Sequence, residues 1–225
     1  HVAYRVTFIP GDGVGPEVME ATRRALEATG VRFDWEYAAI GATALEKYGA
    51  LLPPAALESI RRNGIAIKGP VTTPIGSGFR SVNVALRQEL DLYACVRPVR
   101  WFRGVPSPVK DPGAVDMIIF RENTEDLYSG VEFNPVPQEV ADVLGRLSKP
   151  FSAFKDLPVD QYAISTKIVT RKGSERIIRA AFEYARKYGR KKVTVIHKAN
   201  VVRATEGMFL DIAREIAHEY PEIEM

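Results

Sequence analysis

Cysteine, asparagine and glutamine are scarce in this chain, and their scarcity already limits what it can be. The one cysteine, Cys95, excludes an internal disulfide and favours a reducing compartment. Only five asparagines and three glutamines occur among 225 residues, a composition that heat-adapted proteins tend to share. Because Cys95 lies in the apolar run LYACV, we interpret it as a buried structural thiol.

An excess of charge and long hydrophobic runs are also missing. The formal net charge is +3, and no polybasic block adds to it, so nucleic acid is not an expected partner. No stretch approaches the roughly 20 apolar residues of a membrane span, and no signal peptide opens the chain. We therefore expect no membrane partner and a cytoplasmic location.

Strand-like and helix-like patterns alternate along most of the chain, which predicts an α/β protein with a mostly buried sheet. The expected strands are 4–9, 31–37, 65–69, 92–99, 115–120, 161–169 and 193–197. The expected helices are 16–29, 42–48, 54–63, 82–90, 173–188 and 205–219. The stretch 103–160 is rich in proline and glycine, which favours an irregular excursion, a hairpin or an arm.

The opening phrase IPGDGVGPEV, residues 9–18, has two interpretations. Gly11 and Gly13 fit the start of a dinucleotide-binding fingerprint, and acids that could hold a ribose follow in 31–37. Pro16, however, stands where that fingerprint needs its third glycine. The alternative is a turn that leads into a helix, whose N-terminus could still border an anionic ligand.

A second group of residues indicates a site for a small polyanion. Ser81 is expected to cap a helix that carries Asn83 and Arg87 on one face. Arg97 and Arg121 interrupt apolar strands, where an unpaired charge is costly. Arginine binds carboxylates in a bidentate way, so these side chains could form a cage. The simpler alternative is a capping serine and a solvated Arg87.

Acid–base candidates follow in two later segments. Tyr128 is either a general acid beside the arginines or a tyrosine of an amphipathic strand. Lys198 is a candidate base, because it follows a strand at the edge where α/β proteins bind ligands. His197 has no metal-binding neighbours and is interpreted as structural. The acids Glu122, Glu125 and Asp126 fit an exposed turn better than a metal site, since their spacing matches no ligand motif.

Several long phrases resemble the isocitrate and isopropylmalate dehydrogenase family, the metal-dependent β-decarboxylating dehydrogenases, and above all its prokaryotic NADP-dependent branch that acts on isocitrate. The phrases are GDGVGPEV, IKGPVTTPIGSGFRSVNVALRQELDLYACVRPVR, PSPVK, IFRENTEDLYSG and VIHKANVVRATEG. The resemblance implies an α/β fold with a large and a small domain, not a standard Rossmann fold. It makes GDGVGP a strand-to-helix turn at the edge of the active-site cleft.

The resemblance also implies a domain division. Residues 1–92 would begin the large domain, and 93–225 would form the small domain with a clasp-like insertion at about 126–170. The rest of the large domain, with the metal-binding aspartates and the loop that selects the coenzyme, would lie beyond Met225. We therefore expect no metal ligand within these residues and no activity from the 225-residue chain alone.

The implied reaction is oxidative decarboxylation of isocitrate to 2-oxoglutarate and CO₂, with Mg²⁺ or Mn²⁺ and with NADP in preference to NAD. The implied catalytic pair is Tyr128 and Lys198, with Lys198 reaching into the active site of the partner in a homodimer. The implied substrate-binding residues are Ser81, Asn83, Arg87, Arg97, Arg121, Thr73, Lys68 and Asn200. Thr73 and Asn83 would also contact the coenzyme.

Two alternatives remain beside this interpretation. A homoisocitrate or isopropylmalate dehydrogenase would belong to the same family, but those enzymes lack the pair formed by Ser81 and Asn83. That pair offers polar contacts where an isopropyl group requires apolar neighbours. The other alternative is a non-catalytic fragment that binds substrate analogues or a partner chain.

Overall fold

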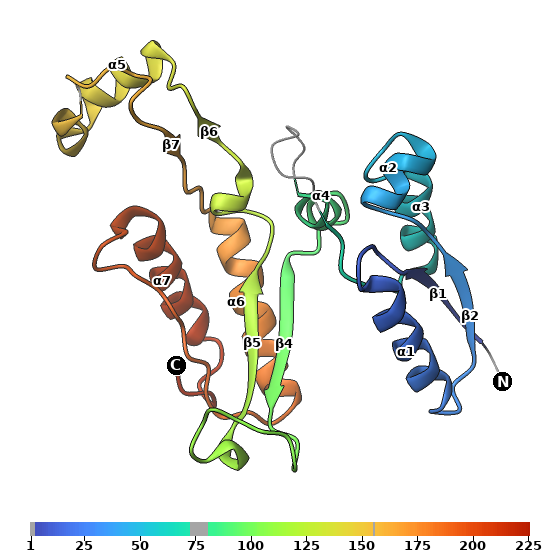
Figure 1. The fold of residues 1–225 in the computed structure, drawn as a ribbon. Coiled ribbons are helices and arrows are strands. Elements are labelled where there is room, and N and C mark those ends of the chain that lie inside the picture. The colour runs from blue at the N-terminus through green and yellow to red at the C-terminus, as the bar shows by residue number, and fades with distance from the viewer. Residues whose placement is uncertain (1–2, 73–80, 155) are drawn as a thin grey trace. The chain divides into compact units, whose positions relative to one another are not determined.

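The computed structural model describes residues 3–72, 81–154 and 156–225, which divide into two compact units (Figure 1). Unit 1 is His1–Leu92 and unit 2 is Tyr93–Met225. Each unit combines helices with strands, so the predicted α/β class is confirmed. Within the described ranges, no helix is both long enough and apolar enough to cross a membrane.

Unit 1 is built on a three-stranded parallel sheet. The central strand β1 (Tyr4–Ile9) pairs with β2 (Phe33–Tyr37) on one side and with β3 (Ala66–Lys68) on the other. Four helices accompany the sheet: α1 (Gly15–Glu27), α2 (Ala42–Tyr48), α3 (Pro54–Asn63) and α4 (Val82–Glu89). Each of these elements lies within two residues of its predicted bounds, because the apolar periods are clear and a proline or glycine marks an end of α1, α2 and α3.

Burial on both faces identifies β1 as the core strand of unit 1. Val6, Phe8 and Ile9 are almost fully buried, and so is Thr7 between them. The hydroxyl of Thr7 lies 2.8 Å from that of Ser59, so its polar group keeps a partner inside the core. The apolar cluster around Ile9 also takes up one face of α4, which leaves the rest of that helix for other contacts.

The turn between β1 and α1 contains the glycines of GDGVGP, and two of them, Gly11 and Gly15, allow close packing of the backbone. A Cβ at Gly11 would lie 2.0 Å from the carbonyl oxygen of Pro70, and φ at Gly11 is +79°. A Cβ at Gly15 would lie 2.4 Å from the carbonyl oxygen of Pro10. The loop is therefore a turn whose glycines allow backbone segments to touch, as the family resemblance implies.

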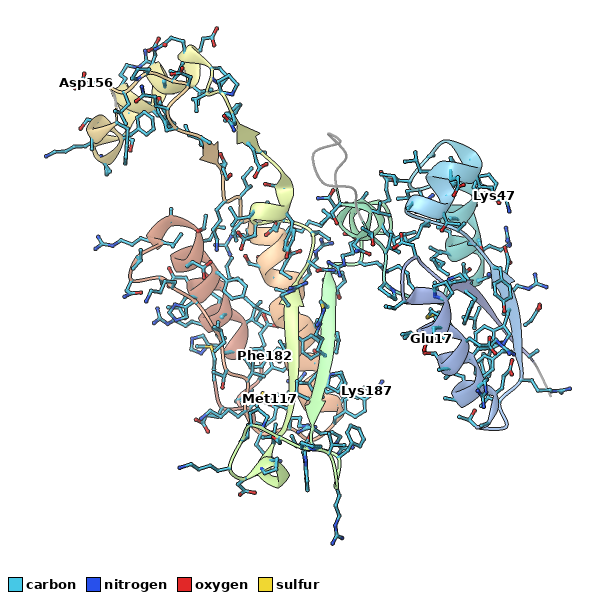
Figure 2. The ribbon with its side chains drawn as sticks, viewed as in Figure 1. Glu17, Lys47, Met117, Asp156, Phe182 and Lys187 are labelled. Atoms are coloured by element: carbon cyan, nitrogen blue, oxygen red, sulfur yellow. The ribbon has the colours of Figure 1, made fainter. Side chains whose placement is uncertain are left out.

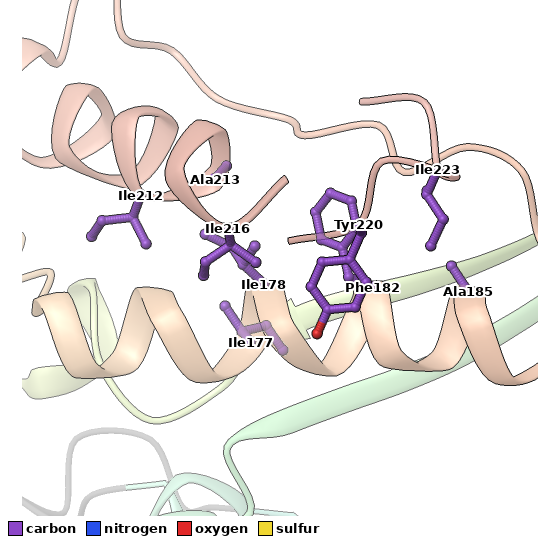
Figure 3. Packing of buried hydrophobic residues seen from close by; sticks show 9 residues of the cluster. All are labelled: Ile177, Ile178, Phe182, Ala185, Ile212, Ala213, Ile216, Tyr220 and Ile223. Carbon is purple, nitrogen blue, oxygen red and sulfur yellow. The ribbon is translucent and has the colours of Figure 1, made fainter. Parts of the chain in front are cut away.

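Unit 2 contains the antiparallel pair β4 (Ala94–Arg100) and β5 (Asp116–Glu122). The long helix α6 (Arg171–Lys187) packs against β5 and against α7 (Arg203–Ala217). Figure 3 shows the core between these helices, where the Phe182 ring has no exposed surface. The other buried members are Ile177, Ile178, Ala185, Ile212, Ala213, Ile216, Tyr220 and Ile223. Short 3₁₀ turns, η1 (Pro112–Ala114) and η2 (Leu127–Ser129), flank β5.

An arm extends from unit 2 between β5 and α6 (Figure 1). Its base is the two-residue antiparallel pair β6 (Glu132–Phe133) and β7 (Ile164–Ser165). Helix α5 (Gln138–Leu147) and the 3₁₀ turn η3 (Lys149–Ala153) lie between these strands. The sequence predicts an arm here, but it missed α5. Val140 and Leu144, four residues apart, were the available signal.

Three sequence expectations are wrong in unit 2. The strand predicted at 161–169 shrinks to β7, and 193–197 forms no strand, since its only nearby pairing is the single bridge between Lys192 and Glu224. A strand requires a neighbouring strand, and the described residues supply none along 193–197. The β4–β5 pair is not mostly buried either: one face is open, and Met117, labelled in Figure 2, is 50% exposed.

Candidate active-site residues on the two units

Helix α4 presents the first set of candidate residues, on unit 1. Val82 and Leu86 are buried against the core, and these contacts fix the rotation of the helix. Asn83 and Arg87 are four residues apart, so they share another, half-buried face. Ser81 occupies the N-cap position as predicted, but its side chain makes no capping hydrogen bond. The Oδ1 atom of Asn83 is buried and has no hydrogen-bond partner among the described residues.

Lys68, at the end of β3, adds a second positive charge to this part of unit 1. Its Nζ atom donates a 2.7 Å hydrogen bond to the carbonyl oxygen of Gly69. Burial lowers the pKa of the Lys68 ammonium, and the positive charge of Arg87 lowers it further, while Asp12 acts in the opposite direction. Lys68 and Arg87 therefore repel each other, and an anion placed beside them would relieve this repulsion. Thr73 lies outside the described residues.

Asp12 is a residue whose role the sequence reasoning missed. Its Oδ1 atom accepts a 2.8 Å hydrogen bond from the backbone N–H of Thr72, and its Oδ2 atom accepts one from Ala42 at 3.4 Å. One carboxylate thus joins the GDGVGP turn to the segment after β3 and to the start of α2. An acid between two glycines of a strand-to-helix turn was the signal that could have revealed it.

In unit 2, strand register brings Arg97 and Arg121 to one face of the β4–β5 pair. Arg97 lies opposite Ile119 and Cys95 opposite Arg121, so the two arginines are diagonal neighbours, typically about 7–8 Å apart at Cα. Both are exposed, so the expectation of charges at buried strand ends is wrong: the open face lets them remain hydrated. Arg97 Nε donates to the Cys95 thiol at 3.2 Å, a contact that raises the pKa of Arg97. Cys95 itself is only half-buried.

The turn after β5 brings Tyr128 to Arg121. The guanidinium carbon of Arg121 lies 6.0 Å from the centroid of the Tyr128 ring, at the outer limit of a cation–π contact. Arg121 Nη2 also donates to Oδ1 of the buried Asn123 at 3.1 Å. Tyr128 is 44% exposed and sits in η2, not in the amphipathic strand that was its alternative interpretation. The guanidinium and the phenol are therefore neighbours on an accessible surface.

The three acids of this turn hold the backbone in place. Glu122 accepts hydrogen bonds from the N–H groups of Thr124 and Glu125, each at 3.0 Å. Glu125 accepts from the N–H of Thr170 at 2.9 Å and from its hydroxyl at 2.7 Å, beside the start of α6. Asp126 accepts from Leu127 N–H at 2.7 Å. Among the described residues, no group of three or more histidine, cysteine, aspartate or glutamate side chains could hold a metal ion.

Lys198 and Asn200 lie in an exposed loop that precedes α7. The carbonyl oxygen of Lys198 accepts hydrogen bonds from Val201 at 3.0 Å and Val202 at 2.9 Å, which close a tight turn. The backbone N–H of Lys198 donates to Glu206 Oε2 at 3.2 Å. His197 accepts from the N–H of Ala199 at 3.1 Å through Nδ1, a local structural contact. The backbone of Lys198 is held, while its side chain is accessible.

Comparison with known proteins identifies the family of this chain. The sequence profile of the isocitrate/isopropylmalate dehydrogenase family matches residues 5–225. The chain belongs to this family. The family fold, with its departure from a standard Rossmann domain, is thereby confirmed.

Two relatives illustrate the likeness. A protein of Staphylococcus epidermidis named isocitrate dehydrogenase [NADP] is 46% identical over 220 residues, which cover 95% of this chain and 52% of the relative. A protein of the same name from Haloferax volcanii is 44% identical over 218 residues, again 95% of this chain and 52% of the relative. The chain thus spans about half the length of the curated relatives it matches.

A solved structure supports the same assignment of fold. The crystal structure of isocitrate dehydrogenase from Methylococcus capsulatus is 48% identical to this chain and superposes with a TM-score of 0.83. The match covers 98% of this chain and 59% of that one. The two units described above are therefore close in fold to part of that enzyme.

Proposed function

We propose that this chain is part of an enzyme that oxidatively decarboxylates isocitrate to 2-oxoglutarate and CO₂, with NADP as hydride acceptor. The observation that carries the proposal is the contact of Arg121 with Tyr128, a cation beside a phenolic proton donor, in a chain 46% identical to a relative named for this reaction. Relatives with that name do not favour the homoisocitrate or isopropylmalate alternative.

Charge and hydrogen-bonding capacity support the proposed substrate contacts. Isocitrate has three carboxylates, and arginine is suited to bind each in a bidentate way. Unit 1 would contribute Arg87 and Lys68, whose mutual repulsion an anion relieves. Unit 2 would contribute Arg97 and Arg121 from the open face of β4 and β5. The remaining proposed contacts come from Ser81, Asn83, Thr73 and Asn200.

The proposed proton transfers use Lys198 and Tyr128. The amine of Lys198 accepts the proton of the substrate hydroxyl as the carbinol carbon is oxidised to a ketone. The bond to the middle carboxylate then breaks, CO₂ leaves, and its electron pair stays behind as an enolate. The Tyr128 phenol donates its proton to the enolate carbon, which completes 2-oxoglutarate. Tyr128 regains a proton from solvent, to which it is open.

The described residues offer a contact for the coenzyme but no cluster of ligands for the metal. Asn83 suits NADP, because its buried Oδ1 atom has no partner among the described residues and could accept an N–H from a carboxamide. When bound there, NADP would supply the acceptor for the hydride of the carbinol carbon. The described residues form no cluster suited to Mg²⁺ or Mn²⁺, so we assign no step to a metal here, although the family's chemistry calls for one.

The remaining proposals concern assembly and location. We propose a cytoplasmic homodimer in which the arm, from β6 to β7, acts as the clasp between subunits. Lys198 and Asn200 would serve the partner's active site. Their exposure in unit 2 supports this, because an accessible side chain is free to enter another subunit. We likewise propose that residues 1–92 begin the large domain and that 93–225 form the small one.

The test is a substrate and coenzyme comparison on the protein at its full natural length. We expect isocitrate with NADP and Mg²⁺ to be turned over far faster than isopropylmalate or homoisocitrate, and faster than isocitrate with NAD. Replacing Ser81 with Val, or Asn83 with Leu, should in each case lower kcat/KM for isocitrate about ten- to a hundredfold, since one lost hydrogen bond to a charged group costs roughly 1.5–3 kcal/mol. Glu89→Gln, an exposed change on the same helix, is the control. Preference for another substrate would overturn the proposal.

A further inference from the structure

Lys167 joins two segments of unit 2 that are far apart in the sequence. It lies between β7 and α6, and its side chain is only 27% exposed. Nζ lies 3.1 Å from Oδ2 of Asp126 and also donates a hydrogen bond to Oε1 of Glu206. One ammonium thus bridges two carboxylates, and each carboxylate still has a second oxygen for another bond.

The second oxygen of Asp126 holds the turn that carries Tyr128. Oδ1 accepts the backbone N–H of Leu127 at 2.7 Å, at the start of η2. The N–H of Asp126 donates to the carbonyl oxygen of Ile168 at 2.8 Å, directly beside Lys167 in the sequence. Asp126 has φ of +67°, an unfavourable conformation for a residue with a side chain, so these contacts must hold it there.

The second oxygen of Glu206 holds the loop that carries Lys198. Oε2 accepts the backbone N–H of Lys198 at 3.2 Å from the first turn of α7. The Glu206 side chain is only 16% exposed, the least of the three, so water competes little for these bonds. The chain of contacts therefore runs from the Leu127 amide through Asp126, Lys167 and Glu206 to the Lys198 amide.

The two carboxylates beside Lys167 favour the charged form of its ammonium. Burial lowers the pKa of Lys167, but its bonds to Glu206 and Asp126 outweigh this, so the pKa of Lys167 is raised overall. Other ion pairs of unit 2 lie elsewhere. Arg179 pairs with Glu219, and Lys192 pairs with Glu224, and neither pair contacts the segments that carry Tyr128 and Lys198. Only the Lys167 cluster, among the described ion pairs, reaches both.

We propose that Lys167 is a positioning residue for the decarboxylation: within one subunit it holds both the η2 turn that carries Tyr128 and the loop whose Lys198 serves the partner's active site. The proposal rests on the proposed function, since it takes Tyr128 and Lys198 as the acid–base pair. Lys167 itself touches no substrate. It acts through two carboxylates, each of which binds a backbone amide next to or at a catalytic position.

Loss of the Lys167 ammonium should lower turnover more than substrate binding. Loss of the ammonium leaves Asp126 and Glu206 as partly buried carboxylates without their shared counter-charge, so they turn toward water. Both amides then lose their acceptors, and the phenol and the amine lose their fixed placement. Arginine side chains elsewhere hold the substrate, so binding should suffer less than turnover, because small misplacement of reacting groups is costly.

The experiment compares Lys167→Met and Lys167→Arg with the unaltered protein at its full natural length, and Lys192→Met is the matched control. Amide hydrogen exchange at Leu127 and Lys198 reports the network directly and does not depend on activity. In Lys167→Met we expect exchange at both amides to rise at least tenfold and kcat for isocitrate to fall at least tenfold, with KM within about threefold. Lys167→Arg, which can also bridge two carboxylates, should recover most of both.

The outcomes separate the two proposals. Unchanged exchange at both amides in Lys167→Met would overturn the network, whatever the activity. Faster exchange with unchanged kcat, or an equal fall of kcat in Lys192→Met, would show that the cluster only stabilises the fold and would overturn the positioning role. Faster exchange in Lys167→Met, together with an unaltered protein that acts on another substrate and does not oxidise isocitrate, would mean that the proposed function fails while the network stands.

Discussion

Adding one methyl group at each of three glycines in the β1–α1 turn separates backbone strain from close contact. Gly13 has φ of +58° and open space around a would-be Cβ, so Gly13→Ala adds strain alone. Gly15 lies at the start of α1, and its Cβ would lie 2.4 Å from the Pro10 carbonyl oxygen, so Gly15→Ala adds contact alone. Gly11→Ala adds both, at φ +79° and 2.0 Å from Pro70.

The magnitudes follow from these differences. A left-handed conformation costs a residue with a Cβ roughly 1–2 kcal/mol, part of which is offset by the stiffer unfolded chain, so Gly13→Ala should lower the free energy of unfolding by about 1 kcal/mol. Forcing backbone atoms apart costs about 1–3 kcal/mol, which is the expectation for Gly15→Ala. Both effects combined give about 2–4 kcal/mol for Gly11→Ala.

Urea unfolding followed by circular dichroism measures all three values on the same protein. The expected order of destabilisation is Gly11→Ala, then Gly15→Ala, then Gly13→Ala. If Gly11→Ala cost no more than Gly13→Ala, the close approach to Pro70 would not exist in solution. NADP affinity adds an independent check: a tenfold loss in Gly13→Ala without a change in stability would restore the phosphate-binding interpretation of the loop.

Three further predictions concern the core, a helix cap and the partly buried ammonium of Lys68. Phe182→Ala removes a ring with no exposed surface and should lower the free energy of unfolding by about 3–5 kcal/mol, whereas Phe154→Ala, at a 48% exposed ring, should change it far less; equal losses would contradict the described core. Thr170→Ala removes the hydroxyl that accepts the Gly173 N–H at 2.9 Å and should cost about 1–2 kcal/mol in thermal unfolding, and an unchanged Tm would argue against this cap. Lys68→Met should raise Tm yet weaken isocitrate binding, as measured by calorimetry. The lowered pKa of Lys68 means that the unfolded chain binds its proton more tightly, so the gain in Tm should be full below the folded pKa and shrink as pH rises through it. A gain that grew with pH would refute this.

Unit 1 was predictable from sequence because its signals are local. Pro16 and Pro54 lie in the first turns of their helices, and Gly49 and Gly64 end theirs in the left-handed conformation. Unit 2 was less predictable where strand formation depends on pairing with a neighbouring strand. The segment 193–197 is rich in β-branched residues, but a strand forms only when another strand lies beside it. Helix α5 was missed because the prolines around it masked a short apolar period.

The sequence by itself determined the elements with clear periodicity, the long family motifs and thereby the proposed reaction with its residues. Only the tertiary structure decided which distant groups meet: Gly11 against Pro70, Arg121 beside Tyr128 on a capped turn, and Lys167 bridging Asp126 and Glu206, of which Glu206 lies 39 residues after Lys167. The physical reason is range. Propensity, capping and period act over a few residues, whereas these contacts arise from strand register and helix packing, which no local pattern encodes.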